Sequence, residues 1–359
     1  MLRLLAACVA LAVPSPVFAE EKDKPKPNTL TPKEIADGWI LLFDGETTFG
    51  WKIEGTAEVK DGVLMLPKGK KTTVYPTALI KHYEVSFDVI GGALIYHTMK
   101  APLAHAEKIK AWDTYTIRSN SNEISFGNSS GDLTTVGGER PDGAQNAPIC
   151  IVSSGDSDVK LRSIKLRPLE TKALFTGKNL DGWKVNAADP KRMASKWEVT
   201  KDGELSVKNG PGDLVSEKEF DNFVLQLECK TLGAALNSGV FFRCVPGQYQ
   251  NGYEAQIQNA FKEDRTKPLD FGTGAIYRRV PARKVVSNDN EWFTMTVAAD
   301  GKHISTWVNG YQTVDWTDER KESDNPRQGY RAAKGPLSIQ GHDPTTDILF
   351  RNIRIAPLP

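Results

Sequence analysis

Polar side chains that could do chemistry recur at every second position in three short segments of the second half of the chain, NSGVFFR, GYEAQIQ and LSIQGH. Because successive side chains of a β-strand point to opposite faces of its sheet, each segment would present its polar groups on one face. The candidate residues on these faces are Asn237, Arg243, Glu254, Gln256, Gln340 and His342. Amides and carboxylates hydrogen-bond hydroxyl groups, and aromatic rings stack on the apolar face of a pyranose, so this combination is typical of a sugar-binding surface.

Two of these residues could transfer protons. His342 lies in a Gln-Gly-His-Asp loop near the C-terminus, and an imidazole, whose unperturbed pKa is about 6.5, suits acid–base chemistry at neutral pH. Glu254 could act as a general base or accept a hydrogen bond from a sugar hydroxyl. The structural alternatives are a loop histidine without a chemical role and a cross-strand ion pair between Glu254 and Arg243.

The elements that must position these residues belong to an internal repeat. LFDG and GWK within residues 42–52 recur as LFTG and GWK within 174–184, and the interval from Phe to Trp is eight residues in both. The first copy ends in VKLRSIKLRPL and the second in ILFRNIRIAPL. We therefore expect two homologous units, residues 37–168 and 172–358, joined by a short connection.

The polar set is confined to the second copy. Val152 and Ser154 of the first copy stand opposite Gln340 and His342 of the second, and Gly92 stands opposite Asn237. If the face were polar only because it meets water, we would expect no such difference between the copies. Sequence drift within one chain can also produce such a difference.

The sequence pattern of both units predicts β structure. Short alternating runs are separated by Asp-Gly and Asn-Gly turn signals, and no segment keeps an apolar period of 3.6 residues over three turns. The 30 Gly and 21 Pro among 359 residues also favour a turn-rich β protein over a helical bundle. We expect an all-β protein of two tandem sandwiches or jelly rolls, in which the last strand of each unit pairs with its beginning.

The N-terminal region reads as an export signal. Arg3 precedes the apolar run 4–13, and Val17-Phe18-Ala19 has the pattern of a cleavage site, so residues 1–19 predict a cleaved signal peptide. This predicts a secreted or periplasmic protein rather than one with a lipid anchor on Cys8, which only seven residues precede. The charged, Pro-rich residues 20–36 predict an extended or disordered linker.

Composition and residue spacing argue against several other functional classes of protein. The 46 Lys and Arg residues against 45 Asp and Glu leave a net charge of +1, which predicts no basic surface for nucleic acid. No transmembrane segment is expected after residue 20, because no run of about 20 apolar residues occurs there. The histidines show no metal-ligand spacing, so no cofactor is predicted; a divalent metal is neither supported nor excluded. Cys150, Cys229 and Cys244 read as small buried hydrophobes.

Several segments of the second copy occur in the order of a known family: LFTGKNLDGWK, NSGVFFR, GYEAQIQN, GTGAIY, WVNG and GPLSIQGHDP. In these segments the chain resembles the 3-keto-disaccharide hydrolase family over residues 172–358, whereas residues 37–168 match only at their two ends and look like a degenerate relative. The resemblance implies a concanavalin A-like jelly roll in each unit. It also implies cleavage of glycosidic bonds in glucosides already oxidised at C3.

The implied chemistry begins with a C3 ketone that acidifies the C2 proton. A base removes this proton, the enolate is stabilised, the C1 substituent leaves, and water can add to the product. By the resemblance, the catalytic residues are His342 and Glu254, and the substrate-binding residues are Asn237, Arg243, Gln256, Tyr277 and Gln340. One departure concerns an Asp that the family usually has shortly after Glu-x-Gln-Ile; here Gln258-Asn259-Ala260 follow.

Two other functions fit the same sequence. A non-catalytic, lectin-like protein would bind carbohydrate through the same polar face without forming product, and the missing Asp favours this alternative. An extracellular scaffold would bind protein through exposed aromatic residues of the first copy. For the enzyme and for the lectin-like protein the expected partner is a carbohydrate, either an oxidised glucoside or a glycan.

Overall fold

The structure is a computed structural model, and it describes residues 26–98, 101–122, 124–128, 134–136 and 149–358. The predicted signal peptide, residues 1–19, lies outside the described residues. The chain is all-β, with three antiparallel sheets of eleven, eight and five strands. Helical structure in the described ranges is limited to α1 (Pro32–Ala36) and the short 3-10 turn η1 (Pro190–Arg192). Within these ranges no helix has the length and hydrophobicity needed to cross a bilayer.

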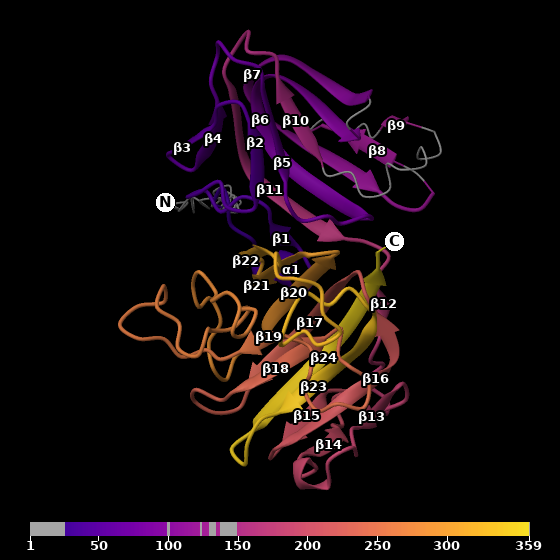
Figure 1. Ribbon diagram of the computed structural model, residues 1–359. Helices are drawn as coiled ribbons and strands as arrows, with labels where there is room; N and C mark the ends of the chain where they lie inside the picture. The colour runs from indigo at the N-terminus through magenta and orange to yellow at the C-terminus, as the bar shows by residue number, and fades with distance from the viewer. Residues whose placement is uncertain (1–25, 99–100, 123, 129–133, 137–148, 359) are drawn as a thin grey trace, which may run out of the picture.

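The first half of the chain forms the eleven-stranded sheet, in the upper part of Figure 1. Its strands are β1 (Ile40–Leu41), β2 (Trp51–Glu54), β3 (Glu58–Lys60), β4 (Val63–Leu66), β5 (Thr72–Pro76), β6 (Tyr83–Thr98), β7 (Ala101–Ser119), β8 (Ile124–Gly127), β9 (Thr134–Val136), β10 (Cys150–Ser153) and β11 (Val159–Pro168). The main path runs β2-β5-β10-β6-β11-β4-β3, and β7, β8 and β9 branch from β6.

The second half forms two sheets that enclose an apolar core between them. The eight-stranded sheet has the order β14-β15-β24-β17-β20-β21-β22, with β12 on β24, and the five-stranded sheet has the order β13-β16-β23-β18-β19. The strands are β12 (Lys172–Ala173), β13 (Trp183–Val185), β14 (Lys196–Val199), β15 (Leu205–Lys208), β16 (Gly212–Phe220), β17 (Phe223–Thr231), β18 (Ser238–Phe242), β19 (Tyr253–Ile257), β20 (Phe293–Asp300), β21 (His303–Val308), β22 (Tyr311–Thr317), β23 (Gly335–Gly341) and β24 (Asp347–Pro357).

The two halves arrange their strands in the same order. The series β3-β4-β11-β6-β7-β8-β9 has the order of β14-β15-β24-β17-β20-β21-β22, and β2-β5-β10-β6 has the order of β13-β16-β23-β18. In the first half the long strand β6 belongs to both series, which joins them into one sheet. The expected closure of each unit is confirmed, because β1 pairs with β11 and β12 pairs with β24.

The repeated tryptophans are core residues in both halves. Trp51 is 9% exposed and Trp183 is 6% exposed. The indole N–H of each donates to a backbone carbonyl nine residues earlier, at 2.5 Å to Leu42 and 3.0 Å to Leu174. Cys150, Cys229 and Cys244 are free and buried, which confirms their interpretation as small core residues.

The linker prediction is wrong for the described residues 26–36. Thr31 and Glu34 form a capping box at the start of α1, in which each side chain accepts from the other residue's backbone N–H. Asn28 donates to the carbonyl of Gly62 and accepts from the N–H of Ser163, which ties the segment to the first half. Charge and proline content predicted disorder, but these polar groups have specific partners in the fold.

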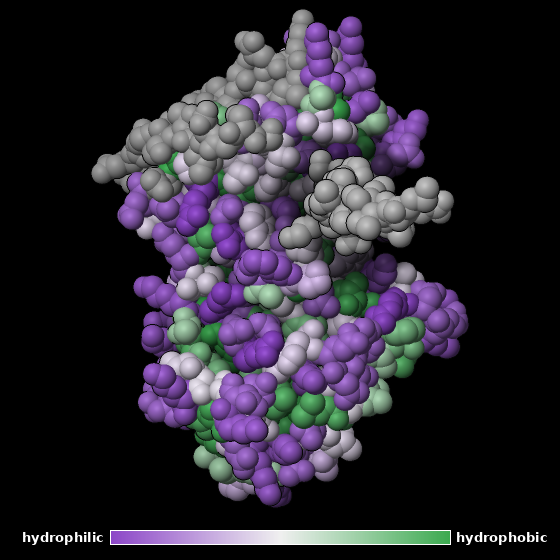
Figure 2. Space-filling view, turned by 180° about the vertical axis from the view of Figure 1, so that it is seen from behind, coloured by the Kyte–Doolittle hydropathy of each residue, from purple (hydrophilic) through white to green (hydrophobic). Residues whose placement is uncertain are grey.

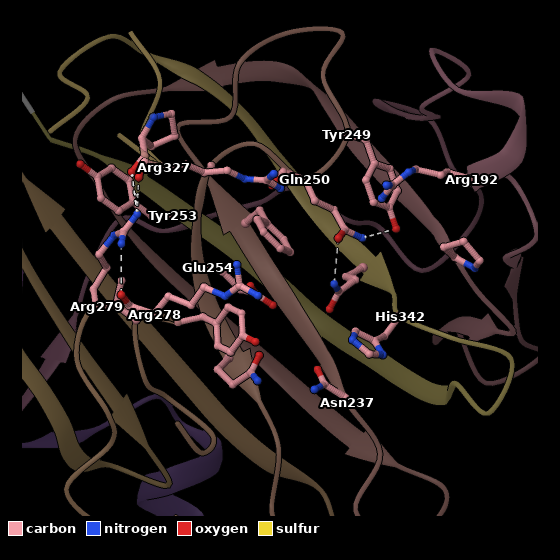
Figure 3. Close-up of a pocket in the computed structure, with 18 residues that line it drawn as sticks. Arg192, Asn237, Tyr249, Gln250, Tyr253, Glu254, Arg278, Arg279, Arg327 and His342 are labelled. Atoms are coloured by element: carbon pink, nitrogen blue, oxygen red, sulfur yellow. Dashed lines mark hydrogen bonds between the residues drawn. The ribbon is translucent and has the colours of Figure 1, made fainter. Parts of the chain in front are cut away.

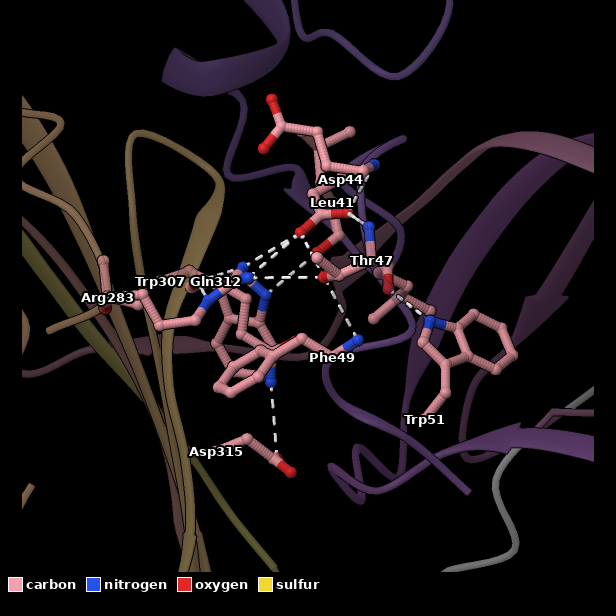
Figure 4. Close-up of polar contacts among 12 residues, drawn as sticks. Leu41, Asp44, Thr47, Phe49, Trp51, Arg283, Trp307, Gln312 and Asp315 are labelled. Atoms are coloured by element: carbon pink, nitrogen blue, oxygen red, sulfur yellow. Dashed lines mark hydrogen bonds and ion pairs between the residues drawn. The ribbon is translucent and has the colours of Figure 1, made fainter. Parts of the chain in front are cut away.

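The two halves are packed against each other through a shared apolar cluster, and Figure 4 shows polar contacts at this boundary. Trp307 of β21 is 1% exposed and packs into the core of the first half, where its indole N–H donates to the carbonyl of Leu41 at 3.0 Å. The amide of Gln226 donates to the carbonyl of Gly38 at 2.9 Å. A second-half tryptophan is therefore part of the first half's core.

Polar contacts complete this boundary. Arg283 lies 3.1 Å from the carboxylate of Asp44, and its guanidinium stacks over the ring of Phe49 at 3.9 Å. Thr77 donates to Asp315 at 2.7 Å. Away from the boundary, the reverse side of the molecule is mostly hydrophilic, with apolar residues scattered among polar ones (Figure 2).

Candidate functional site

A cavity of about 540 Å³ opens over the five-stranded sheet of the second half (Figure 3). Its floor comes from β18, β19 and β23, and its walls come from loops that follow or precede them. The polar and aromatic residues that line it are Arg192, Asn237, Phe241, Tyr249, Gln250, Tyr253, Glu254, Gln256, Tyr277, Arg278, Arg279, Arg327, Gln340 and His342.

Six of the seven predicted site residues line this one pocket: Asn237, Glu254, Gln256, Tyr277, Gln340 and His342. Strand alternation places Glu254, Gln256 and Gln340 there as expected, since their neighbours in β19 and β23 point into the core: Ala255, Ile257, Leu337 and Ile339. The other three lie outside the strands: Asn237 directly before β18, His342 directly after β23, and Tyr277 in a loop. The pairing of β18 with both β19 and β23 then brings the three polar faces together.

Arg243 does not join them, so its predicted role in substrate binding is not supported. Strand β18 ends at Phe242, and Arg243 has a φ of 49°, which stops the alternation of faces. Its side chain is fully buried away from the pocket. The guanidinium donates to the carbonyls of Asp221, Gly301 and Arg331 and to the side chain of Asn222. Arg243 therefore holds three chain segments together.

Glu254 is the acidic residue of the pocket lining. It is 8% exposed, and a Cβ placed on Gly239 would lie 2.4 Å from its Oε1, so the glycine leaves room for the carboxylate. Burial, helped by the negative charge of Asp270, raises the pKa of Glu254 to about 8, although Arg278 and Arg327 oppose the shift. At neutral pH Glu254 is therefore mostly protonated and can donate a proton.

His342 follows directly after β23 and stands 40% exposed at the pocket. Its Nδ1 lies 2.7 Å from Oδ2 of Asp343, whose other oxygen accepts from the hydroxyl of Thr345. This hydroxyl and His342 lower the pKa of Asp343, so the carboxylate is ionised and can only accept. In the neutral imidazole the proton therefore sits on Nδ1, and Nε2 is left as an acceptor.

The pocket amides leave acceptor atoms unused. Gln256 donates to the carbonyl of Asp270 at 3.0 Å, Asn237 donates to the carboxylate of Asp270 at 2.6 Å, and Gln340 donates to Gln250 at 2.9 Å. The Oε1 atoms of Gln256 and Gln340 are buried without a hydrogen-bond partner. Buried polar atoms usually have partners, so these two oxygens are suited to accept from hydroxyl groups of a ligand.

Residues 170–356, more than half of the chain, match the 3-keto-alpha-glucoside-1,2-lyase-like domain family. The chain belongs to this family. The predicted resemblance to 3-keto-disaccharide hydrolases over residues 172–358 is thereby confirmed. The chain carries a carbohydrate-active domain, and the candidate pocket lies wholly within it.

Two solved structures from Parabacteroides distasonis ATCC 8503, each named "putative glycosyl hydrolase", are similar to this member of the family. One is 24% identical with a TM-score of 0.43, over 53% of this chain and 94% of its own. The other is 30% identical with a TM-score of 0.41, over 53% of this chain and all of its own. The carbohydrate-binding module CBM66 from Bacillus subtilis is 13% identical with a TM-score of 0.34, over 50% of this chain and 97% of its own. No curated protein matches.

The departure from the family pattern lies outside the pocket. Asn259 is 4% exposed, and its Oδ1 accepts from Thr273 at 2.6 Å and from Ser287 at 2.5 Å. Gln258 donates to the carbonyl of Ala235. These residues hold the loops that carry Ala235, Thr273 and Ser287, and neither Gln258 nor Asn259 lines the pocket.

Sequence reasoning missed the arginines and loop residues of the pocket. Arg278 and Arg279 directly follow the predicted Tyr277, which was a signal that could have found them. Arg192 and Arg327 lie in loops far from the recognised motifs, and nothing in the sequence places them there. Among the described residues, no group of three or more His, Cys, Asp or Glu could hold a metal ion.

Proposed function

We propose that the second half cleaves the glycosidic bond of glucosides oxidised at C3, by removal of the C2 proton and elimination of the C1 substituent. Family membership supports the substrate class. The observation that carries the proposal is a matched acid and base in one pocket. Glu254 is protonated at neutral pH because its pKa is raised to about 8, and His342 has a free Nε2 because Asp343 engages its Nδ1.

These two groups would act in sequence. His342 Nε2 removes the C2 proton, and the electrons of the C2–H bond form an enolate across C2 and C3. Tyr277 lines the pocket, and in this proposal its hydroxyl donates a hydrogen bond to the enolate oxygen. Glu254 protonates the glycosidic oxygen as the C1–O bond breaks, so the aglycone leaves as an alcohol and a C1–C2 double bond forms. The proton on His342 then returns to Glu254 through solvent, and addition of water to the double bond would complete a net hydrolysis.

The test compares a 3-keto-glucoside with its unoxidised parent, with and without chelator. Release of the aglycone from the keto sugar alone is the expected result, because only the ketone acidifies the C2 proton. The chelator arm reports any dependence on a metal. Equal release from both sugars, or release from neither by the folded protein, would contradict the proposal.

The non-catalytic alternative has one observation in its favour. The unpaired Oε1 atoms of Gln256 and Gln340 would bind hydroxyl groups whether or not a reaction follows. Calorimetric binding to a glycan panel without product formation would support this lectin-like function. The scaffold alternative has no such observation in its favour. Among the side chains whose exposure the structure describes, a range that leaves out residues 94–109, the large apolar ones that are exposed lie in the second half: Val185, Met193, Leu232, Phe261 and Leu269.

Two further proposals concern the origin of the first half and the cellular location of the whole protein. We infer that it is a degenerate copy of the second, so that the chain contains two tandem concanavalin A-like jelly rolls. The matching strand orders and the repeated tryptophan anchors support this. Secretion, or export to the periplasm, rests on the N-terminal sequence alone.

A further inference from the structure

Positive charge is concentrated at the pocket. Its lining contains four arginines and a single acidic residue, Glu254, whereas the whole chain has nearly equal numbers of basic and acidic residues. Because Glu254 is mostly protonated at neutral pH, it neutralises little of this charge. The concentration is therefore a property of the site and does not follow from the composition.

Two of the four arginines have structural partners. Arg192 lies 3.3 Å from Asp189, and its guanidinium stacks on the ring of Tyr249 at 4.2 Å. Arg279 donates to the carbonyls of Arg278, Pro326 and Arg327, which fixes the loop that carries these residues. The fold itself accounts for both of these guanidinium groups.

The other two, Arg278 and Arg327, have no acidic partner within 4 Å in the part of the chain that the structure describes. The guanidinium of Arg327 makes one hydrogen bond there, to the carbonyl of Gln250 at 2.8 Å. The guanidinium of Arg278 makes none among the described residues, and it lies 5.2 Å from the centre of the Tyr277 ring. Both side chains are exposed at the mouth of the pocket, on the side where Figure 3 shows Glu254.

The backbone at Arg278 has an uncommon conformation. Ile276 and Val280 bond to each other through both backbone pairs, so the three residues between them form a tight turn. Arg278 has a φ of 58° within this turn, which a side chain other than glycine rarely adopts. Strained residues of this kind cluster at ligand sites, where the surrounding structure holds them in place.

We propose that the pocket takes a glycoside whose aglycone carries an anionic group, a carboxylate or a sulfate or phosphate ester, bound by Arg278 and Arg327. A guanidinium matches all three anions with paired N–H donors. The inference rests on the proposed elimination, because Glu254 protonates the oxygen that leaves with the aglycone and these arginines lie on the Glu254 side. A neutral aglycone would leave both charges unpaired.

The experiment uses 3-keto-glucosides of phenols that differ only in the para substituent: neutral, carboxylate, sulfate or phosphate. We expect kcat/KM at least about tenfold higher for the anionic aglycones than for the neutral one, with the advantage falling as salt is added. The carboxylate, sulfate and phosphate arms identify the preferred anion. Equal kcat/KM for all four compounds would overturn the inference while leaving the elimination itself intact.

Variants localise the effect. In the double variant Arg278→Gln, Arg327→Gln the ratio of anionic to neutral kcat/KM should fall to about one. Arg118→Gln makes the same change at a half-exposed arginine of the first half and should keep the wild-type ratio. A ratio that survives in the double variant would contradict the assignment of these two residues.

A second readout separates this inference from the proposed function. If no keto-glucoside is cleaved, the elimination proposal fails, and calorimetry with the unoxidised 4-carboxyphenyl glucoside decides the anion site. Binding to the wild type that weakens about tenfold in the double variant supports the anion site, and binding of equal strength to both proteins overturns it.

Discussion

In the second half Ile339 of β23 pairs with Leu214 of β16, and in the first half Ile151 of β10 pairs with Val74 of β5. All four side chains are buried, so the core-facing positions of the two sheets correspond. One residue further along, the second half has Gln340 in the pocket, whereas the first half has Val152.

The neighbouring strand shows the same contrast. By the same register, Gly239 beside the carboxylate of Glu254 corresponds to Leu94, and Asn237 corresponds to Gly92. The core face is constrained by packing, because any loss of apolar volume there costs stability. The opposite face is free to change, and at these positions the second half has the amides Gln340 and Asn237 where the first half has Val152 and Gly92.

The largest expected effect comes from giving the second half the first half's residue at the histidine position. His342→Ser, which copies Ser154, should lower turnover of a 3-keto-glucoside at least about 100-fold, because the base is lost. Glu254→Gln should do the same by removing the acid. The exposed Glu217→Gln serves as the matched control and should leave turnover unchanged.

Steady-state kinetics on folded variants measure this effect. Near-wild-type turnover in His342→Ser would mean that the polar face of the second half differs from the first without carrying the chemistry.

The next effect is a pH dependence of stability. The pKa of Glu254 is about 8 in the fold against a reference value of 4.5, so between these values the folded state binds more protons than the unfolded state. The free energy of unfolding of the wild type should therefore fall as pH rises from 4.5 to 8. Glu254→Gln lacks this fall and should be more stable by about 5 kcal/mol at pH 9 but not at pH 4.

Urea unfolding at pH 4, 7 and 9 tests this, with Glu217→Gln as the control. If the difference between Glu254→Gln and the wild type is the same at all three pH values, the carboxylate is not held in its neutral form by burial.

Gly239→Ala tests the space that the second half reserves for its carboxylate. The new Cβ would lie 2.4 Å from Oε1 of Glu254, so the side chain must move, and we expect a loss of about 2 kcal/mol in unfolding free energy. Gly233→Ala, where the nearest atom is a flexible leucine methyl at 3.3 Å, is the matched control. Thermal unfolding of both variants should show a clear drop only for the first; equal midpoints would refute the packing argument.

The smallest effect concerns the boundary between the halves. Arg283→Gln removes the ion pair with Asp44 and the stacking on Phe49, and we expect a loss of about 1 kcal/mol with unchanged turnover. Chemical denaturation and the keto-glucoside assay measure the two quantities. A large loss of turnover would mean that contacts from the first half position the pocket residues, and do not only stabilise the second half.

Period-two alternation made much of the site predictable. It separated Glu254 and Gln256 from the core residues of β19, and Gln340 and His342 from those of β23. The same reasoning failed at Arg243, because alternation holds only while the backbone stays extended, and the strand ends one residue earlier. The N-terminal helix was also missed, although its capping box, Thr31 and Glu34, stands in the sequence.

The sequence by itself determined the all-β class, the repeat, the core anchors and the faces of the strands, because these depend on local spacing and on burial of apolar side chains. Only the tertiary structure decided which loops meet over the sheet, and it brought Arg278 and Arg327 to the same pocket as Glu254. It also decided the protonation of Glu254, since the pKa of a carboxyl depends on the burial and charges around it, which come from distant parts of the chain.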